Sequence, residues 1–167
     1  MELTEATSFD ESSNPLDMIE AILTEQDWAY DRPAEDELNV EVQGHWCGYH
    51  LSFSWHETLE ALHLACTFDV KVQKEKRAEI VALLALINEQ LWAGHFDMWS
   101  EDGMLIFRHG VLLQGEAELT PEQAHALLQL PVDGCERYFP AFQFVLWGGK
   151  TALEAMAAAM FETAGQA

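Results

Sequence analysis

By type and spacing, the residues best suited to chemistry are two histidines and an aspartate. His95 and Asp97 flank Phe96, and His109 lies near the far end of the same predicted hairpin. Two histidines and one carboxylate are the ligand set of non-haem iron enzymes, provided that all three converge on one metal. In the predicted hairpin, however, His95 and Asp97 share one face of the sheet and His109 lies on the other. The spacing therefore predicts no metal site here.

Three further histidines, His50, His56 and His63, lie on the polar face of a second predicted hairpin. Zinc requires three or four nitrogen or sulfur ligands, but the nearby thiols of Cys47 and Cys66 face the apolar side of the same strands. We interpret these histidines as surface residues that face solvent or a partner. No metal and no cofactor are predicted.

Cys135 is a candidate nucleophile and would need a base within hydrogen-bond reach. It keeps helical spacing with Phe139 and Phe142, which predicts core packing, and no histidine is near it in the sequence. The chain also lacks the glycine-rich phosphate loops and the Gly-x-Ser-x-Gly and Cys-x-x-Cys motifs. The sequence therefore predicts a protein that is not an enzyme, with no catalytic residues.

The remaining candidate site consists of Asp97, Trp99, Ile106 and Arg108. A two-residue turn at Asp102-Gly103 would place Asp97 opposite Arg108 and Trp99 opposite Ile106. A Trp, an Ile and an Arg exposed together are typical of a protein-interaction surface. The alternative is that a terminal helix covers them. We take these four residues as the predicted interaction patch.

These residues lie on strands that the hydropathy pattern predicts. Apolar and polar residues alternate with a period of two in residues 38–42, 47–55 and 62–70, which indicates half-buried antiparallel strands. A two-residue turn at 44–45 would pair Val42 with Cys47 and Val40 with Tyr49. The hairpin over residues 95–113 adds two more strands.

Helical periodicity predicts the first two helices. Asn14 caps a helix that begins at Pro15 and ends near Trp28. Residues 74–93 form a second helix, which Gly94 stops. Because this helix is apolar around most of its circumference, we expect it to be buried on more than one side.

Two capping boxes, at Thr120 and Thr151, predict two C-terminal helices. We expect Pro131 and Pro140 to kink or divide the first of them. The inner face of the last helix is predicted to be Leu153, Met156, Ala157, Met160 and Phe161. Since strands and helices occur in separate runs, the fold class is α+β, with helices packed on an antiparallel sheet of five or six strands.

The chain is strongly acidic. Its 167 residues include 29 Asp and Glu but only 8 Lys and Arg, so the net charge is −21. Nucleic acids and anionic lipid surfaces are bound through clustered basic side chains, and we exclude both as partners. A basic protein partner would instead associate faster in this field. The apolar fraction of 49% is sufficient for a folded core.

The sequence gives no sign of export or of a membrane span. Residues 1–13 contain four acidic residues and no basic one, unlike a secretory signal, and predict a flexible acidic tail. The longest apolar run, residues 81–87, is far shorter than the roughly 20 residues that a membrane-spanning helix needs. The three cysteines are widely spaced and do not form a disulfide framework. We expect a cytoplasmic protein.

Two segments resemble alphaproteobacterial members of the YbjN-like family: residues 94–100, Gly-His-Phe-Asp-Met-Trp-Ser, with Phe107-Arg108-His109, and the run from Cys135 to Lys150. With the opening Asn14-Pro15-Leu16, the resemblance covers about residues 14–165 and implies one domain. These families are labelled sensory-transduction regulators. The resemblance implies a fold related to that of type III secretion chaperones, which bind segments of other proteins, commonly as dimers. It carries no catalytic residue.

The sequence and the resemblance together predict a non-enzymatic protein-interaction module, either chaperone-like or regulatory. The expected partner is a protein or peptide, with a basic client favoured by the charge; a homodimer is the other expected form of association. The alternative is a small-molecule sensor or an enzyme with a pocket between the sheet and the C-terminal helices. A closed pocket with convergent polar groups would favour the alternative, and an open apolar surface would favour the interaction module.

Overall fold

The computed structural model describes residues 13–164, so the predicted tail lies outside the described residues except for Ser13. The chain forms one six-stranded antiparallel sheet with strand order β1-β2-β3-β4-β6-β5. The strands are β1 (Tyr30–Ala34), β2 (Glu37–Gln43), β3 (Gly48–His56), β4 (Ala61–Lys71), β5 (His95–Met98) and β6 (Met104–Leu112). The helices are α1 (Pro15–Glu25), the 3-10 turn η1 (Lys74–Lys76), α2 (Arg77–Asn88), α3 (Pro121–Leu146) and α4 (Ala152–Ala164). The predicted α+β class with five or six antiparallel strands is confirmed.

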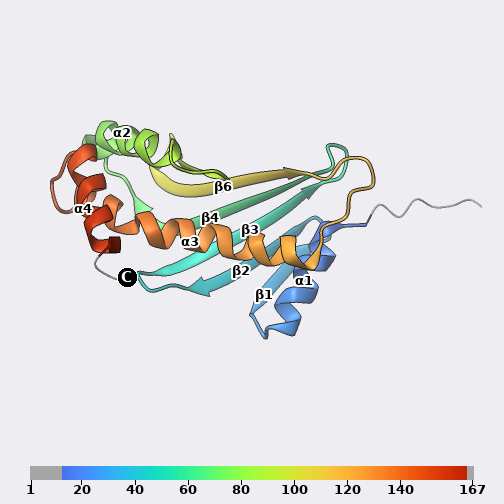
Figure 1. The fold of residues 1–167 in the computed structure, drawn as a ribbon. Helices are drawn as coiled ribbons and strands as arrows, with labels where there is room; N and C mark the ends of the chain where they lie inside the picture. The colour runs from blue at the N-terminus through green and yellow to red at the C-terminus, as the bar shows by residue number, and fades with distance from the viewer. Residues whose placement is uncertain (1–12, 165–167) are drawn as a thin grey trace, which may run out of the picture.

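The long helix α3 runs along one face of the sheet and organises the molecule (Figure 1). It contacts β4 and β6 beneath it, α1 near the β1–β2 side, and α2 and α4 at the opposite end. None of the helices described combines the length and apolarity that a membrane crossing requires.

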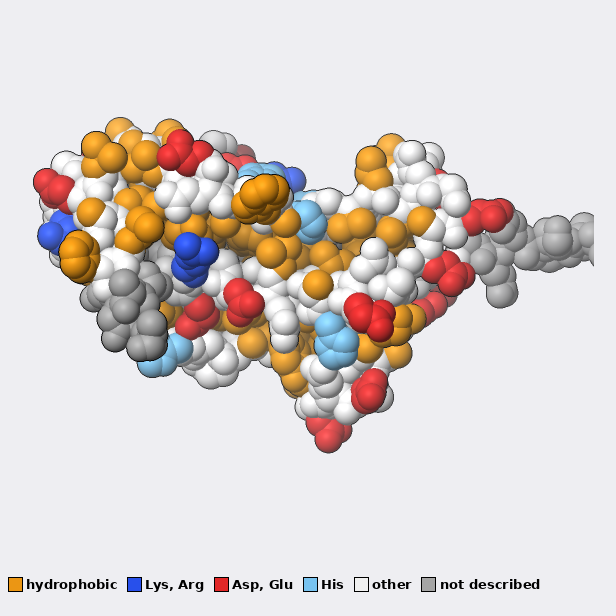
Figure 2. Space-filling view, in the orientation of Figure 1, with side chains coloured by type: hydrophobic (Ala, Val, Ile, Leu, Met, Phe, Trp, Pro, Cys, Tyr) orange, Lys and Arg blue, Asp and Glu red, His pale blue; other side chains and the backbone are white. Residues whose placement is uncertain are grey.

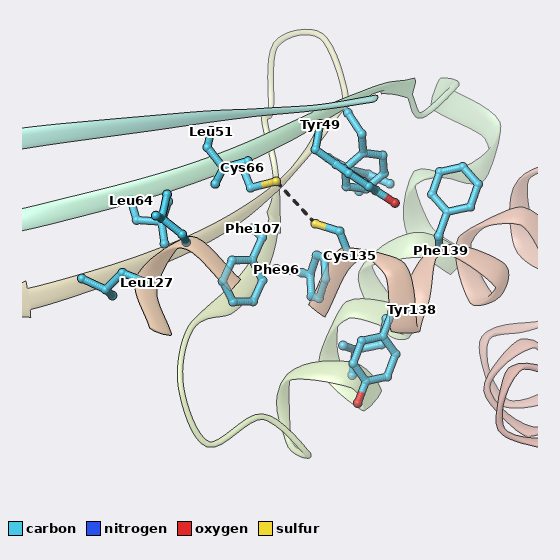
Figure 3. Close-up of a cluster of buried hydrophobic side chains, with 14 of the residues drawn as sticks. Tyr49, Leu51, Leu64, Cys66, Phe96, Phe107, Leu127, Cys135, Tyr138 and Phe139 are labelled. Carbon is cyan, nitrogen blue, oxygen red and sulfur yellow. Dashed lines mark hydrogen bonds between the residues drawn. The ribbon is translucent and has the colours of Figure 1, made fainter. Parts of the chain in front are cut away.

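The core lies between α3 and the sheet face that it covers. In β2, β3, β4 and the first half of β6, alternate residues point to this face and most of them are buried, as the period-two pattern predicts. Figure 3 shows Leu64 of β4 close to Leu127 of α3, and Phe107 of β6 beside Phe96 of β5. On the other face of the sheet, side chains are exposed or half-buried, with Ile106 as the exception. We call this second surface the outer face.

The predicted helix starts are confirmed by their capping hydrogen bonds. The side chain of Asn14 accepts from the backbone N–H of Leu16 at 2.9 Å. At α3, Thr120 and Gln123 form the reciprocal capping box. The backbone N–H of Thr151 likewise donates to the carboxylate of residue 154, whose own N–H donates to the Thr151 hydroxyl.

The register predicted for the β2–β3 hairpin is wrong by two residues. Val42 lies opposite Tyr49 and Val40 opposite Leu51, in place of the expected partners Cys47 and Tyr49. The strands are joined by a four-residue loop, which a 2.8 Å hydrogen bond closes from its first amide to its last carbonyl. Because side chains alternate with a period of two, a two-residue displacement leaves the same residues on the apolar face.

The β5–β6 register is also wrong by two residues. Asp97 lies opposite Ile106, not Arg108, and Trp99 lies beyond the paired residues in the connecting loop. Of the Asp102-Gly103 pair, only Gly103 has a positive φ, +75°, whereas a type I′ turn requires two such residues. The Gly103 N–H instead donates to the Trp99 carbonyl, which makes the loop longer.

The helix expected over residues 74–93 is shorter and less buried than predicted. It begins with the turn η1 and ends at Asn88, whose side chain bonds to the backbone of β5. Its buried side chains form a single stripe, while Val81 is 54% exposed. The expectation of burial on more than one side is wrong, because α2 packs at the end of the sheet with one stripe toward α3, α4 and β5, and Val81 lies outside that stripe.

The two C-terminal helices also differ from expectation. Pro131 and Pro140 do not divide α3, which is assigned as helix throughout Pro121–Leu146. Of the predicted inner face of α4, only Met156 is buried; the others, Leu153, Ala157, Met160 and Phe161, are exposed. The alanines Ala152, Ala155 and Ala159 are buried instead, because their small side chains let α4 approach its neighbours closely.

Candidate functional site

The structure brings the predicted interaction patch together around one small pocket. Asp97, Trp99, Ile106 and Arg108 line a hollow of about 190 Å³ on the outer face, together with the residues next to Trp99. Trp99 is 55% exposed, whereas Ile106 is only 4% exposed. Ile106 is therefore the buried floor of the pocket, and Trp99 is the exposed apolar side chain beside it.

Arg108 is partly held by neighbouring side chains. Its Nη1 lies 3.7 Å from the Asp97 carboxylate, and its Nε donates to His63 Nε2 at 3.3 Å. Burial, reinforced by the positive charge of Arg108, lowers the pKa of His63. A neutral His63 is the form that can accept this hydrogen bond.

The histidines considered as metal ligands do not converge. His95 and Asp97 lie on the outer face, and His109 lies on the helix-covered face, because β5 and β6 alternate as paired strands do. His50 contacts the carboxylate of Glu41 at 2.6 Å. Among the described residues, no group of three or more His, Cys, Asp and Glu is arranged to hold a metal ion.

Cys135 lies in the core, as predicted. Its Sγ is 3.8 Å from the Sγ of Cys66, and both thiols are buried between α3 and β4 (Figure 3). The hydrogen bond to Cys66 and burial raise the pKa of Cys135 well above its ordinary value, which opposes formation of the reactive thiolate. This arrangement is that of packed core thiols.

One apolar surface feature was not identified by the sequence analysis. An open groove of about 430 Å³ lies between β6 and the N-terminal half of α3. Its lining is mainly apolar: Ala93, Val111, Leu119, Ala126, Leu127 and Leu130, with His109, Gln123, Gln129 and Asp133 as the polar members. In Figure 2, hydrophobic side chains form a band across the middle of the molecule, between the positions of β6 and α3. We call this feature the α3–β6 groove.

The groove exists because β5 is much shorter than β6. β5 begins at His95 and pairs with β6 only up to Arg108, so residues 109–112 form an edge of the sheet above the groove. Before β5 the chain turns at Gly94, which has φ +72° and lies so close to Phe107 that a Cβ would be 2.2 Å from its ring. In the sequence, Gly94 is the signal that could have located this edge, because it marks where β5 begins.

A second apolar surface lies on α2 and α4. Val81 of α2 is 54% exposed, and Leu153 and Phe161 of α4 are 73% and 83% exposed. The two helices pack against each other at one end of the molecule. We call this surface the α2–α4 face.

Fold and site together define the class: a single-sheet α+β protein with an open apolar groove between its long helix and its sheet. The sequence model of the YbjN family, described as "Putative bacterial sensory transduction regulator", matches residues 15–144. The chain belongs to this family, as the resemblance in its sequence indicated.

Two of the solved structures that are similar to this chain illustrate its fold. One is the "Crystal structure of YbjN, a putative transcription regulator from E. coli", with a TM-score of 0.52 and 13% sequence identity over 71% of this chain and 84% of that one. The other is the "Crystal Structure of the ExsC-ExsE Complex", with a TM-score of 0.43 and 20% identity over 59% of this chain and 71% of that one. A comparison with curated proteins gives no significant match. At this identity the likeness to E. coli YbjN shows a shared fold.

Proposed function

We propose that this protein is a non-enzymatic module that binds a segment of a partner protein in the α3–β6 groove. The observation that carries the proposal is the groove itself, which is open along the surface and mainly apolar. Contiguous exposed apolar surface is typical of sites that bind proteins. A small-molecule sensor would instead need an enclosed pocket whose polar groups converge on the ligand.

The predicted interaction patch contributes a second contact in this proposal. Its exposed Trp99 is the kind of large, rigid side chain that anchors interfaces, and its Arg108 is half-exposed beside it. The patch and the α3–β6 groove lie on opposite faces of the same β5–β6 pair. A partner that wraps around the short end of β5 would reach both.

We place this binding in a cytoplasmic protein of regulatory or chaperone-like role. The cysteines are few and widely spaced in the sequence, which supports a reducing compartment. The net charge of −21 favours a basic protein partner and opposes nucleic acid. The regulatory role agrees with the description of the family.

A homodimer through the α2–α4 face is the second association that we propose. Within α2 the charged residues are Arg77 and Glu79, both in its first turn, and α4 carries only two glutamates. Two copies could therefore bring Val81, Leu153 and Phe161 together with few like charges in contact, although the whole chain is strongly acidic. Two-fold pairing closes such an interface.

Peptide display tests the proposed function. A library of random peptides is selected on the full chain, and the selected peptides are then measured on Ala126→Trp, which fills the groove from an exposed helix position. Ala21→Trp, at an exposed position of α1, is the matched control. We expect Ala126→Trp to lose binding and Ala21→Trp to retain it. Failure to select any peptide, or equal binding to both variants, would contradict the proposal.

A further inference from the structure

The geometry points to how the partner binds: we propose that a basic, extended segment pairs with residues 109–112 of β6 as an added strand. This inference rests on the proposed function and specifies its binding mode and the chemistry of the partner. Main-chain pairing at an open sheet edge supplies affinity, and the groove beneath it can take alternate side chains.

The directions of the backbone N–H and C=O groups along β6 show which of them can pair with an added strand. Next to the last residue of β6, the Leu113 N–H donates to the carbonyl of Glu60, which directly precedes β4. On the β5 side, the Met104 carbonyl accepts from the Trp99 N–H. Because these directions alternate along a strand, even-numbered residues of β6 face β5. Pairing with β5 stops at Arg108, so the N–H and C=O groups of Gly110 and Leu112 point to an edge where residues 13–164 place no partner strand.

The remaining sheet edges are protected against strand addition. Along β5, the side-chain amide of Asn88 donates to the Phe96 carbonyl at 3.0 Å and accepts from the Phe96 N–H at 2.8 Å. The other edge strand, β1, contains Pro33, which cannot donate a ladder hydrogen bond. Arg32 of β1 pairs with Asp17 at 2.8 Å and with a glutamate of α1. Proline and charged side chains are the usual protection of an edge, and residues 109–112 lack both.

The surroundings of residues 109–112 leave room for an added strand. A Cβ built on Gly110 would meet no atom within 4 Å. Val111 faces the groove, and Leu127 and Leu130 line its opposite wall. Every second side chain of the added strand would therefore enter an apolar groove, and the intervening ones would point to the outer face.

The charge of the groove and its surroundings indicates a basic segment. No Lys or Arg lines the groove, and Asp133 is its acidic member. Glu116 and Glu118 lie in the loop before α3, and Glu122 lies in the first turn of α3. A second copy of this chain, or its own acidic residues 1–13, would bring like charges to the edge. A segment in which apolar and basic residues alternate would place its apolar side chains in the groove, and its basic side chains would be attracted by the negative charge of the chain.

A designed peptide and two variants of one residue test the inference on the full chain. The probe is a short acetylated peptide in which valine and lysine alternate; its counterpart has glutamate in place of lysine. Gly110→Pro removes the outward N–H without removing a bond to β4, and proline is tolerated at such an edge position. Gly110→Ala keeps the N–H and is the matched control. Affinity is measured by titration, and amide exchange of residues 110 and 112 by NMR.

We expect the valine–lysine peptide to bind, to slow amide exchange at Gly110 and Leu112, and to bind better than the glutamate peptide. Gly110→Pro should lose about fivefold or more in affinity, as for one lost hydrogen bond, and Gly110→Ala less than about twofold. Equal binding to both variants, unchanged amide exchange, or no binding at millimolar peptide would overturn the inference. So would exchange that is already slow in the chain alone, which would indicate its own terminus or a second copy.

The two proposals fail differently. If Ala126→Trp abolishes binding of displayed peptides while Gly110→Pro leaves the binding of the valine–lysine peptide unchanged, the α3–β6 groove is the site and strand addition is refuted. If Ala126→Trp has no effect on the displayed peptides, the groove itself is refuted.

Discussion

Replacing Asn88 by alanine should destabilise the fold, because one side chain satisfies both backbone groups of Phe96. The two hydrogen bonds are 3.0 and 2.8 Å long and partly buried. A net contribution of about 1 kcal/mol for each bond gives about 2 kcal/mol. Because alanine has a higher helix propensity than asparagine and Asn88 is the last residue of α2, the substitution offsets a few tenths of a kcal/mol of this loss. For a chain of this length, about 2 kcal/mol corresponds to a fall in Tm of about 4–8 °C.

Urea unfolding measures this loss, provided that the m-value is unchanged. Asn88→Asp should give a smaller loss, because a carboxylate still accepts from the Phe96 N–H. Asn39→Ala is the control: the side chain of Asn39 makes only a 3.4 Å contact with Glu37 on the exposed sheet surface, so the expected change is below about 0.5 kcal/mol. A loss for Asn88→Ala no larger than that of the control would refute the argument that this side chain protects the β5 edge.

Three further outcomes follow from the structure. The free energy of unfolding should fall as the pH drops below about 6.5, because the folded state lowers the pKa of His63 and so binds this proton less readily than the unfolded chain. His63→Gln should reduce this fall, and a pH profile identical to that of the wild type would contradict the prediction. In the folded protein a thiol reagent should label Cys47 slowly, because burial raises its pKa, and should not label the buried Cys66 and Cys135. All three thiols should react in denaturant, and rapid labelling of Cys135 in the native state would disprove the buried pair. Light scattering should give twice 18.9 kDa for wild type and a monomer for Val81→Glu, whereas a wild-type monomer at tens of micromolar would exclude the dimer.

The alternation of apolar and polar residues was sufficient to predict the faces of the strands but not their registers. Both hairpins are displaced by two residues, and a two-residue displacement moves no side chain to the other face. The hydropathy pattern therefore cannot distinguish one register from the other. The register depends on loop conformation, which in the second hairpin is set by the single positive φ at Gly103. For the same reason Asp97, Trp99, Ile106 and Arg108 still line one pocket, although Asp97 and not Trp99 lies opposite Ile106.

The sequence could not show how helices approach one another. In α4 the largest apolar side chains were expected inside, but close packing against α2 and α3 selects the alanines and leaves Leu153 and Phe161 exposed. The α3–β6 groove was missed because it depends on where β5 stops, and that position is set by the turn at Gly94. Neither the close packing of α4 nor the end of β5 changes the hydropathy pattern of the residues in these segments.

The position of α3 in the chain has a consequence for synthesis. All six strands lie before residue 113, and the helix that covers them begins at residue 121 and ends at residue 146. During translation the sheet therefore leaves the ribosome before its cover, with the face that carries Leu64 and Phe107 still open to water. Exposed apolar faces and strand edges are what make nascent chains associate wrongly. A ribosome that pauses before residue 146 would hold this protein at the stage at which it most needs protection by chaperones.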